Sequence, residues 1–141
     1  MGAGGASSKT TGRSGKTARL QDIADGIRTK SSDELLSAVQ KLKPTADAAK
    51  YDEFGNVVVS QTAEVSAGNL RIQLGFSNDY DPRQVRGTVR APIKTNIEAV
   101  IWKNGHVTAV RTLAETKTKS IKNASKNYQN MLDNWRKLIG E

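Results

Sequence analysis

The chain has 141 residues, a length typical of one domain, and its 36% hydrophobic and 5% aromatic content suggests that part of it lies outside a packed core. Its 22 lysines and arginines outnumber the 14 acidic residues, and the resulting net charge of +8 favours acidic partners such as nucleic acid or a nucleoprotein. The absence of cysteine excludes disulfides and thiolate metal sites, and a single histidine argues against a histidine metal cluster.

The N-terminal segment 1–18 contains no acidic residue and, after Met1, no large apolar side chain. Such a segment cannot bury enough apolar surface to offset the entropy lost on ordering it. We therefore predict that 1–18 is a disordered basic arm and that 19–141 forms a single domain. The positive charge of the arm comes from Lys9, Arg13, Lys16 and the adjoining Arg19.

Within this arm, residues 11–17 read TGRSGKT and end in the Gly-Lys-Thr of a phosphate-binding P-loop. The motif also requires a glycine five residues before Gly15, where this chain has Thr10, and a buried strand in front of the loop. The preceding residues include no apolar run that could form such a strand. We interpret the segment as part of the arm, and we expect no nucleotide or other small-molecule cofactor.

Two short helices are predicted to follow the arm. Apolar residues recur at helical spacing across 20–27. Residues 31–34 read SSDE, which fits a capping box with Ser31 as the N-cap, and the helix that begins there must end before Pro44. The segment 45–54 is ambiguous between a loop and a weak helical turn.

After residue 55 the apolar pattern changes to a period of two, which is typical of strands. Segment 57–65 is rich in β-branched residues, and segment 70–76 alternates apolar and polar side chains. Segment 84–91 shows a similar alternation. These segments predict an antiparallel sheet.

A hairpin is predicted where Asn104-Gly105 separates the strands 97–102 and 107–113, because both turn residues tolerate positive φ. Apolar residues on both faces of this hairpin predict a central place in the sheet. The turn sets the expected register, with Trp102 opposite Val107, Val100 opposite Ala109, and Glu98 opposite Arg111.

A long helix over about 116–139 carries one apolar stripe that should pack on the sheet. Trp135 in this stripe and Trp102 in the hairpin are both expected in the core. The predicted fold is α+β, with two short N-terminal helices, a four- to five-stranded antiparallel sheet, and the long C-terminal helix packed on it. A basic exposed edge lies away from the stripe and consists of Lys119, Lys122 and Lys126.

Four arginines occupy outward positions on strands that are expected to be neighbours. They are Arg71, Arg86, Arg90 and Arg111. On one face they would form a strip that binds phosphates, because the planar guanidinium group grips a phosphate with two hydrogen bonds. With the arm and the basic edge, this strip predicts binding to the backbone and shape of nucleic acid. The alternative is a solvated sheet face.

His106 is the only histidine and the one usual candidate for a general base. At the exit of a hairpin it is expected to be an exposed turn residue. The catalytic alternative joins it to Arg111, Arg86 or Lys103 in a small metal-independent RNase, where basic groups stabilise the charged transition state. The acidic pair Asp79 and Asp81 lacks further ligands, so we expect no metal site.

The first eight residues, MGAGGASS, resemble the Gly-Ala-Ser leaders of small accessory proteins of Firmicutes phages and prophages. This resemblance implies a phage protein in the host cytosol. It also implies three roles, which are an inhibitor of a CRISPR effector complex (anti-CRISPR), a head-associated or assembly protein, and a phage nuclease.

The chain lacks any apolar run near the roughly 20 residues of a membrane helix, and its start lacks the apolar core of a signal peptide. We therefore expect a cytoplasmic protein with no membrane partner. The predicted function is non-catalytic binding of nucleic acid or of a nucleoprotein complex. The alternatives are the RNase that uses His106 and the phage assembly protein.

Overall fold

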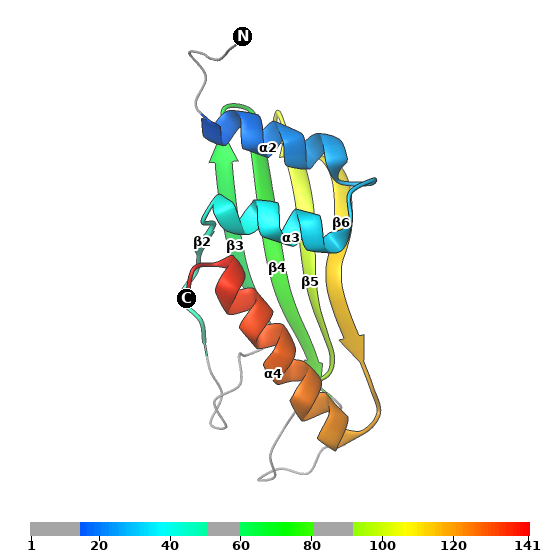
Figure 1. The fold of residues 1–141 in the computed structure, drawn as a ribbon. Helices are drawn as coiled ribbons and strands as arrows, with labels where there is room; N and C mark the ends of the chain where they lie inside the picture. The colour runs from blue at the N-terminus through cyan, green and yellow to red at the C-terminus, as the bar shows by residue number, and fades with distance from the viewer. Residues whose placement is uncertain (1–14, 51–59, 81–91) are drawn as a thin grey trace.

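The computed structural model describes residues 15–50, 60–80 and 92–141, which form three helices and one five-stranded sheet and confirm the α+β fold (Figure 1). None of these helices is both long and apolar enough to cross a membrane. The elements in chain order are α2 (Gly15–Gly26), α3 (Ser32–Lys41), β2 (Thr45–Ala46), β3 (Ser60–Ala67), β4 (Leu70–Tyr80), β5 (Pro92–Lys103), β6 (His106–Lys117) and α4 (Ile121–Leu138).

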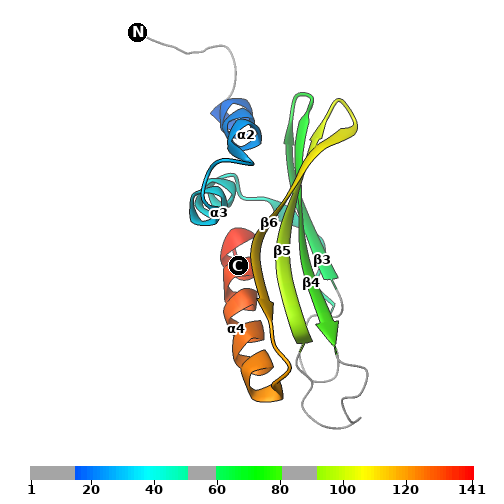
Figure 2. The ribbon, with the colours of Figure 1, turned by 90° about the vertical axis from the view of Figure 1, so that its right-hand side faces the viewer.

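The sheet is an antiparallel meander in the order β2-β3-β4-β5-β6, so that each strand pairs with its neighbour in the sequence. Figure 2 shows α2, α3 and α4 together on one face of this sheet. The predicted packing of the last helix on the sheet is confirmed. The opposite face is covered by none of the described helices, as an antiparallel sheet permits.

Helix α2 begins at Gly15, so residues 15–18 are helical and the prediction that they belong to a disordered arm is wrong. Lys16, Ala18 and Arg19 are good helix formers, and they extend by one turn a helix whose buried residues begin at Leu20. The rest of the predicted arm, with Lys9 and Arg13, lies outside the described residues.

The predicted capping box of α3 is confirmed. The backbone N–H of Glu34 donates to Ser31 Oγ at 3.2 Å, and the backbone N–H of Ser31 donates to Glu34 Oε1 at 3.3 Å. The helix ends at Lys41, and Lys43 then adopts a φ of 52°. This left-handed conformation is one in which a side chain crowds the backbone.

Lys43→Gly is expected to raise the free energy of unfolding by about 0.5 kcal/mol, because glycine adopts positive φ without a crowded Cβ atom. Urea denaturation followed by circular dichroism measures this difference. Lys43→Ala is the matched control, since it removes the same charge and keeps the crowded Cβ atom. Equal stability of the glycine and alanine variants would contradict the prediction.

The turn between β5 and β6 is confirmed, since Asn104 has a φ of 53° and Gly105 a φ of 80°. The central position predicted for the hairpin is wrong, because β6 lies at the edge of the sheet and pairs only with β5. The outward apolar residues of β6, Val107 and Val110, are 49% and 56% exposed. The apolar residues on both faces of β6 therefore do not mean that both faces of this strand are buried.

The register of this hairpin differs from the prediction after its first pair. Trp102 is opposite Val107 as predicted, but a bulge leaves Thr108 as an extra residue in β6. Residues 109–112 of β6 are therefore shifted by one position, which exchanges the two faces of this stretch, and a second bulge at Leu113 restores the expected faces for 114–117. The observed pairs are Ile101 with Ala109, Val100 with Val110, Ala99 with Arg111, and Glu98 with Thr112.

The core fills the space between the sheet and the three helices. Its centre is an aromatic cluster in which the ring of Phe76 lies 5.5 Å from that of Trp135 and 6.4 Å from that of Tyr128. Trp135 is fully buried, and its Nε1–H donates to Gln61 Oε1 at 2.7 Å. The hydrogen bond satisfies a polar group that would be costly to bury alone.

Candidate binding surfaces

The uncovered face of the sheet, called the open face below, presents every second side chain of β3 to β6. The alternating burial of these strands and their register identify the residues. Its charged residues are Glu64, Arg71, Asp79, Lys94, Glu98, Glu115 and Lys117, and its large apolar residues are Val100, Trp102, Val107 and Val110.

Arg71 is held on the open face by two neighbours. Its guanidinium carbon lies 4.4 Å from the centre of the Trp102 ring, and its Nη1 lies 3.7 Å from Glu64 Oε1. Trp102 in turn donates from Nε1 to Gln73 Oε1 at 3.1 Å. Trp102 is thus half-buried on the open face, and its predicted place in the core is wrong.

Arg111 points to the opposite face, where the helices lie. Its Nη1 donates to the carbonyl oxygens of Ile27 at 2.7 Å and Lys30 at 3.1 Å, and its Nη2 donates to Ser32 Oγ at 3.2 Å. Unpaired carbonyls at the end of a helix carry partial negative charge, which a guanidinium group satisfies well. Arg111 therefore fastens the α2–α3 connection to β6.

The predicted strip of four arginines is not formed as expected. Arg71 and Arg111 lie on opposite faces of the sheet because of the bulge at Thr108, so the prediction that they share a face is wrong. Arg86 and Arg90 lie outside the described residues.

His106 is exposed at the end of the hairpin, opposite Lys103, as predicted for a turn residue. Arg111 follows it five positions later in the same strand, which corresponds to about 15 Å along the backbone. The guanidinium group of Arg111 is also occupied by the helix carbonyls. The structure therefore does not bring His106 and Arg111 together, whereas Lys103 lies opposite His106 and Arg86 lies outside the described residues.

The basic edge of the last helix is confirmed as an exposed feature, with Lys119 just before α4 and Lys122 and Lys126 on it. Lys16 and Arg19 are exposed at the start of α2. Figures 1 and 2 place these two helix starts at opposite ends of the molecule. The described basic residues of the predicted arm and of the last helix thus form two separate regions.

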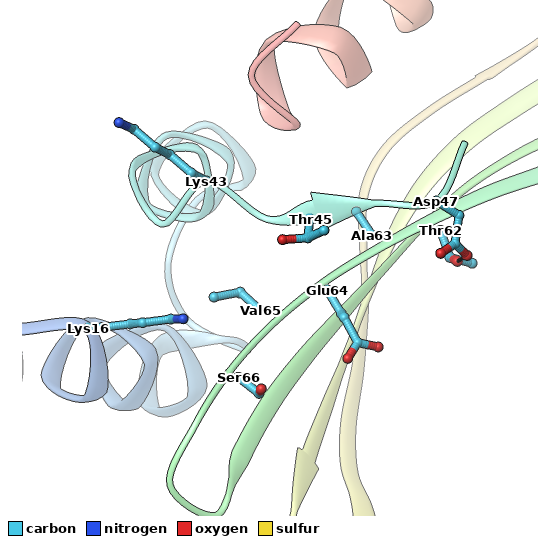
Figure 3. Close-up of a pocket in the computed structure, with 9 residues that line it drawn as sticks. All are labelled: Lys16, Lys43, Thr45, Asp47, Thr62, Ala63, Glu64, Val65 and Ser66. Carbon is cyan, nitrogen blue, oxygen red and sulfur yellow. Dashed lines mark hydrogen bonds between the residues drawn. The ribbon is translucent and has the colours of Figure 1, made fainter. Parts of the chain in front are cut away.

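A pocket of about 390 Å³ lies between the start of α2, the end of α3 and the edge formed by β2 and β3. Figure 3 shows Lys16 reaching toward Val65 and Ser66, while Lys43 points away from them. Asp47 accepts a hydrogen bond from Thr62 Oγ1 at 2.8 Å. Because its charged groups do not converge, the pocket lacks the geometry of a phosphate or cation site.

No group of three or more histidine or acidic residues that could hold a metal ion occurs within 15–50, 60–80 and 92–141. Asp81, one of the two acids considered from the sequence, lies outside these ranges.

Comparison of the chain with family models, with curated proteins and with solved structures finds no match. The resemblance of the first eight residues to phage leaders therefore stays a prediction, as do the functions that it implies.

Proposed function

We propose that the chain is a non-catalytic protein that binds nucleic acid or a nucleoprotein through the basic helix starts of α2 and α4. The observation that carries this proposal is the local charge of the three helices. The positive end of a helix favours acidic residues, and α3 follows this rule with Asp33 and Glu34 in its first turn. The first turns of α2 and α4 contain no acidic residue.

Both of these helix starts carry basic residues in place of acidic ones. Lys16 lies in the first turn of α2, and Lys122 lies in that of α4, close to Lys119 and Lys126. Each basic residue at a helix start lowers the stability of the helix by a few tenths of a kcal/mol. Departures from a local rule at an exposed surface are expected where function requires them. Two such regions at opposite ends suit an extended polyanion.

The resemblance of residues 1–8 to phage leaders suggests a more specific role. A phage accessory protein with these surfaces would inhibit a CRISPR effector complex by contacting its guide RNA or its nucleic-acid channel in the host cytosol. The RNase alternative has weaker support, because His106 and Arg111 lie apart. Co-elution with an effector complex and loss of its cleavage activity, without RNA degradation, is the expected result for an inhibitor.

A variant with glutamine at Lys119, Lys122 and Lys126 is expected to bind oligonucleotides more weakly than the unchanged chain. Each phosphate contact contributes about 0.7 to 0.9 to the slope of log affinity against log salt concentration, so the loss of three contacts should lower this slope by about 2 to 3. Fluorescence anisotropy with labelled single- and double-stranded RNA and DNA measures the slope.

The matched control replaces three lysines of the sheet, Lys94, Lys103 and Lys117, with glutamine. It removes the same charge and should leave most of the slope unchanged. An equal loss in the control would contradict the assignment to α4. If the unchanged chain shows no salt-dependent binding to any of the four nucleic acids, the proposed function itself fails.

A further inference from the structure

Four apolar side chains gather on the open face at the end of the sheet nearest the β5–β6 turn. Val100 pairs with Val110, and Trp102 pairs with Val107, so the four residues occupy two cross-strand pairs. Val107 and Val110 are the exposed large hydrophobic residues of the described chain. We call these four residues the turn-end patch.

The charge of the open face differs from that of the whole chain. Its charged residues include three basic and four acidic side chains, in a chain with a net charge of +8. Two ion pairs neutralise part of this charge, at 3.7 Å between Arg71 and Glu64 and at 3.5 Å between Lys94 and Glu115. A polyanion is therefore not attracted here, whereas a second copy meets less repulsion here than at the basic helix starts.

The size of the open face also suits a protein interface. Four strands spaced about 4.8 Å apart, each about 11 residues long, cover about 19 Å by 36 Å, or about 700 Å². Two such faces in contact would bury on the order of 1,400 Å², within the range of about 1,200 to 2,000 Å² found for stable interfaces.

We propose that two copies of the chain associate through their open faces and form a β-sandwich with the helices outside. Packed sheets lie about 10 Å apart with their strands aligned to within about 30°. A twofold axis along the strand direction, between β4 and β5, keeps the turn ends of both copies together. Val100 and Trp102 of the two copies then lie close to the axis, whereas Val107 and Val110 lie over β3 of the other copy. The hydrogen bond to Gln73 and the contact with Arg71 hold the Trp102 ring in place, so it can act as a preorganised anchor.

This association leaves the basic starts of α2 and α4 exposed on both outer sides of the dimer. It does not depend on the proposed function, since a dimer forms without nucleic acid. If both proposals hold, the dimer presents two copies of each basic region to one polymer and raises the apparent affinity through bivalent binding.

The test measures the mass of the full chain by sedimentation equilibrium, over protein concentrations from micromolar to millimolar. The expected result is reversible formation of a species with twice the chain mass. Val110→Glu is expected to raise the dimer dissociation constant at least about 100-fold, because the twofold axis places two unpaired charges in the interface. Val110 is 56% exposed in one copy, so this variant should fold normally by circular dichroism.

Ser37→Glu is the matched control, because it adds the same charge on the exposed surface of α3 and should leave the dissociation constant unchanged. A chain that stays monomeric at millimolar concentration overturns the proposal. A dimer that is insensitive to Val110→Glu and weakened by Ser37→Glu also overturns it, since the contact then lies on the helix side.

Cysteine crosslinking gives an independent readout, since the chain contains no cysteine. Val100→Cys, which lies close to the axis, is expected to form a covalent dimer with a short bismaleimide, and Ser37→Cys is expected to stay uncrosslinked. The reverse pattern overturns the proposal. A chain that stays monomeric but loses oligonucleotide binding on Val110→Glu would overturn it as well and would assign the open face to nucleic acid.

Discussion

Trp135→Ala is expected to lower the free energy of unfolding by about 4 kcal/mol, whereas Trp102→Ala should lower it by only about 1 kcal/mol. Trp135 is fully buried against the ring of Phe76, so its removal leaves a cavity in the core. It also leaves the buried Gln61 Oε1 without its donor. Trp102 is half-buried on the open face and leaves no enclosed cavity.

Urea denaturation of the two variants, followed by circular dichroism, measures this difference. Both variants should be compared at the lowest practical protein concentration, because a dimer through the open face would add a concentration-dependent cost to Trp102→Ala. Equal losses for the two tryptophans would contradict their assignment to opposite faces of the sheet.

Arg111→Met is expected to lower the free energy of unfolding by about 2 to 3 kcal/mol, because hydrogen bonds from a charged group contribute about that much when they fasten a helix end. The variant leaves the carbonyls of Ile27 and Lys30 without the donor that the guanidinium group supplies. Arg71→Met removes an arginine whose ion pair is exposed, and it should cost less than about 1 kcal/mol.

Denaturation of both arginine variants, together with hydrogen exchange of residues 27–32, measures the effect. Faster exchange of this connection in Arg111→Met, with unchanged oligonucleotide binding, is the expected result. Loss of binding without loss of stability would show instead that Arg111 contacts the ligand, as the sequence first suggested.

The sequence predicted those parts of the fold that depend on local interactions. The capping box at Ser31 and the turn at Asn104-Gly105 are each set by a few adjacent residues, and both are confirmed. The alternation of strand β4 is equally local, because one face of this strand is packed under helices and the other is not. Local patterns of this kind predict the structure correctly because no distant contact competes with them.

The faces of β6 could not be predicted, because the bulge at Thr108 has no sequence signal of its own. One extra residue exchanged the faces that were expected for Val110 and Arg111. An uncovered face was expected, because the strand arginines were placed on it, but the exposed apolar side chains of that face were not predicted. Two short helices and one long helix are too few to cover both faces of a five-stranded sheet, so some apolar residues had to stay exposed.

Among the candidate binding residues, too, the predictions that depended on a single element were correct and those that depended on several elements were not. The exposure of Lys119, Lys122 and Lys126 followed from the apolar stripe of a single helix, and it is confirmed. The strip of strand arginines required the correct pairing of several strands, and its described members lie on opposite faces. Separation of the two basic helix starts depends on the tertiary arrangement, which no local pattern contains.

The meander also bears on how the chain folds. Every pairing in the sheet joins strands that follow one another in the sequence, so the sheet can grow one strand at a time, and its longest connection is 47–59. Helix α4 follows the whole sheet in the chain, yet it supplies Trp135 and Tyr128 to the aromatic cluster. During synthesis the sheet can therefore assemble before α4 emerges. Chaperone protection matters most in that interval, because the apolar side chains that α4 later covers are then exposed.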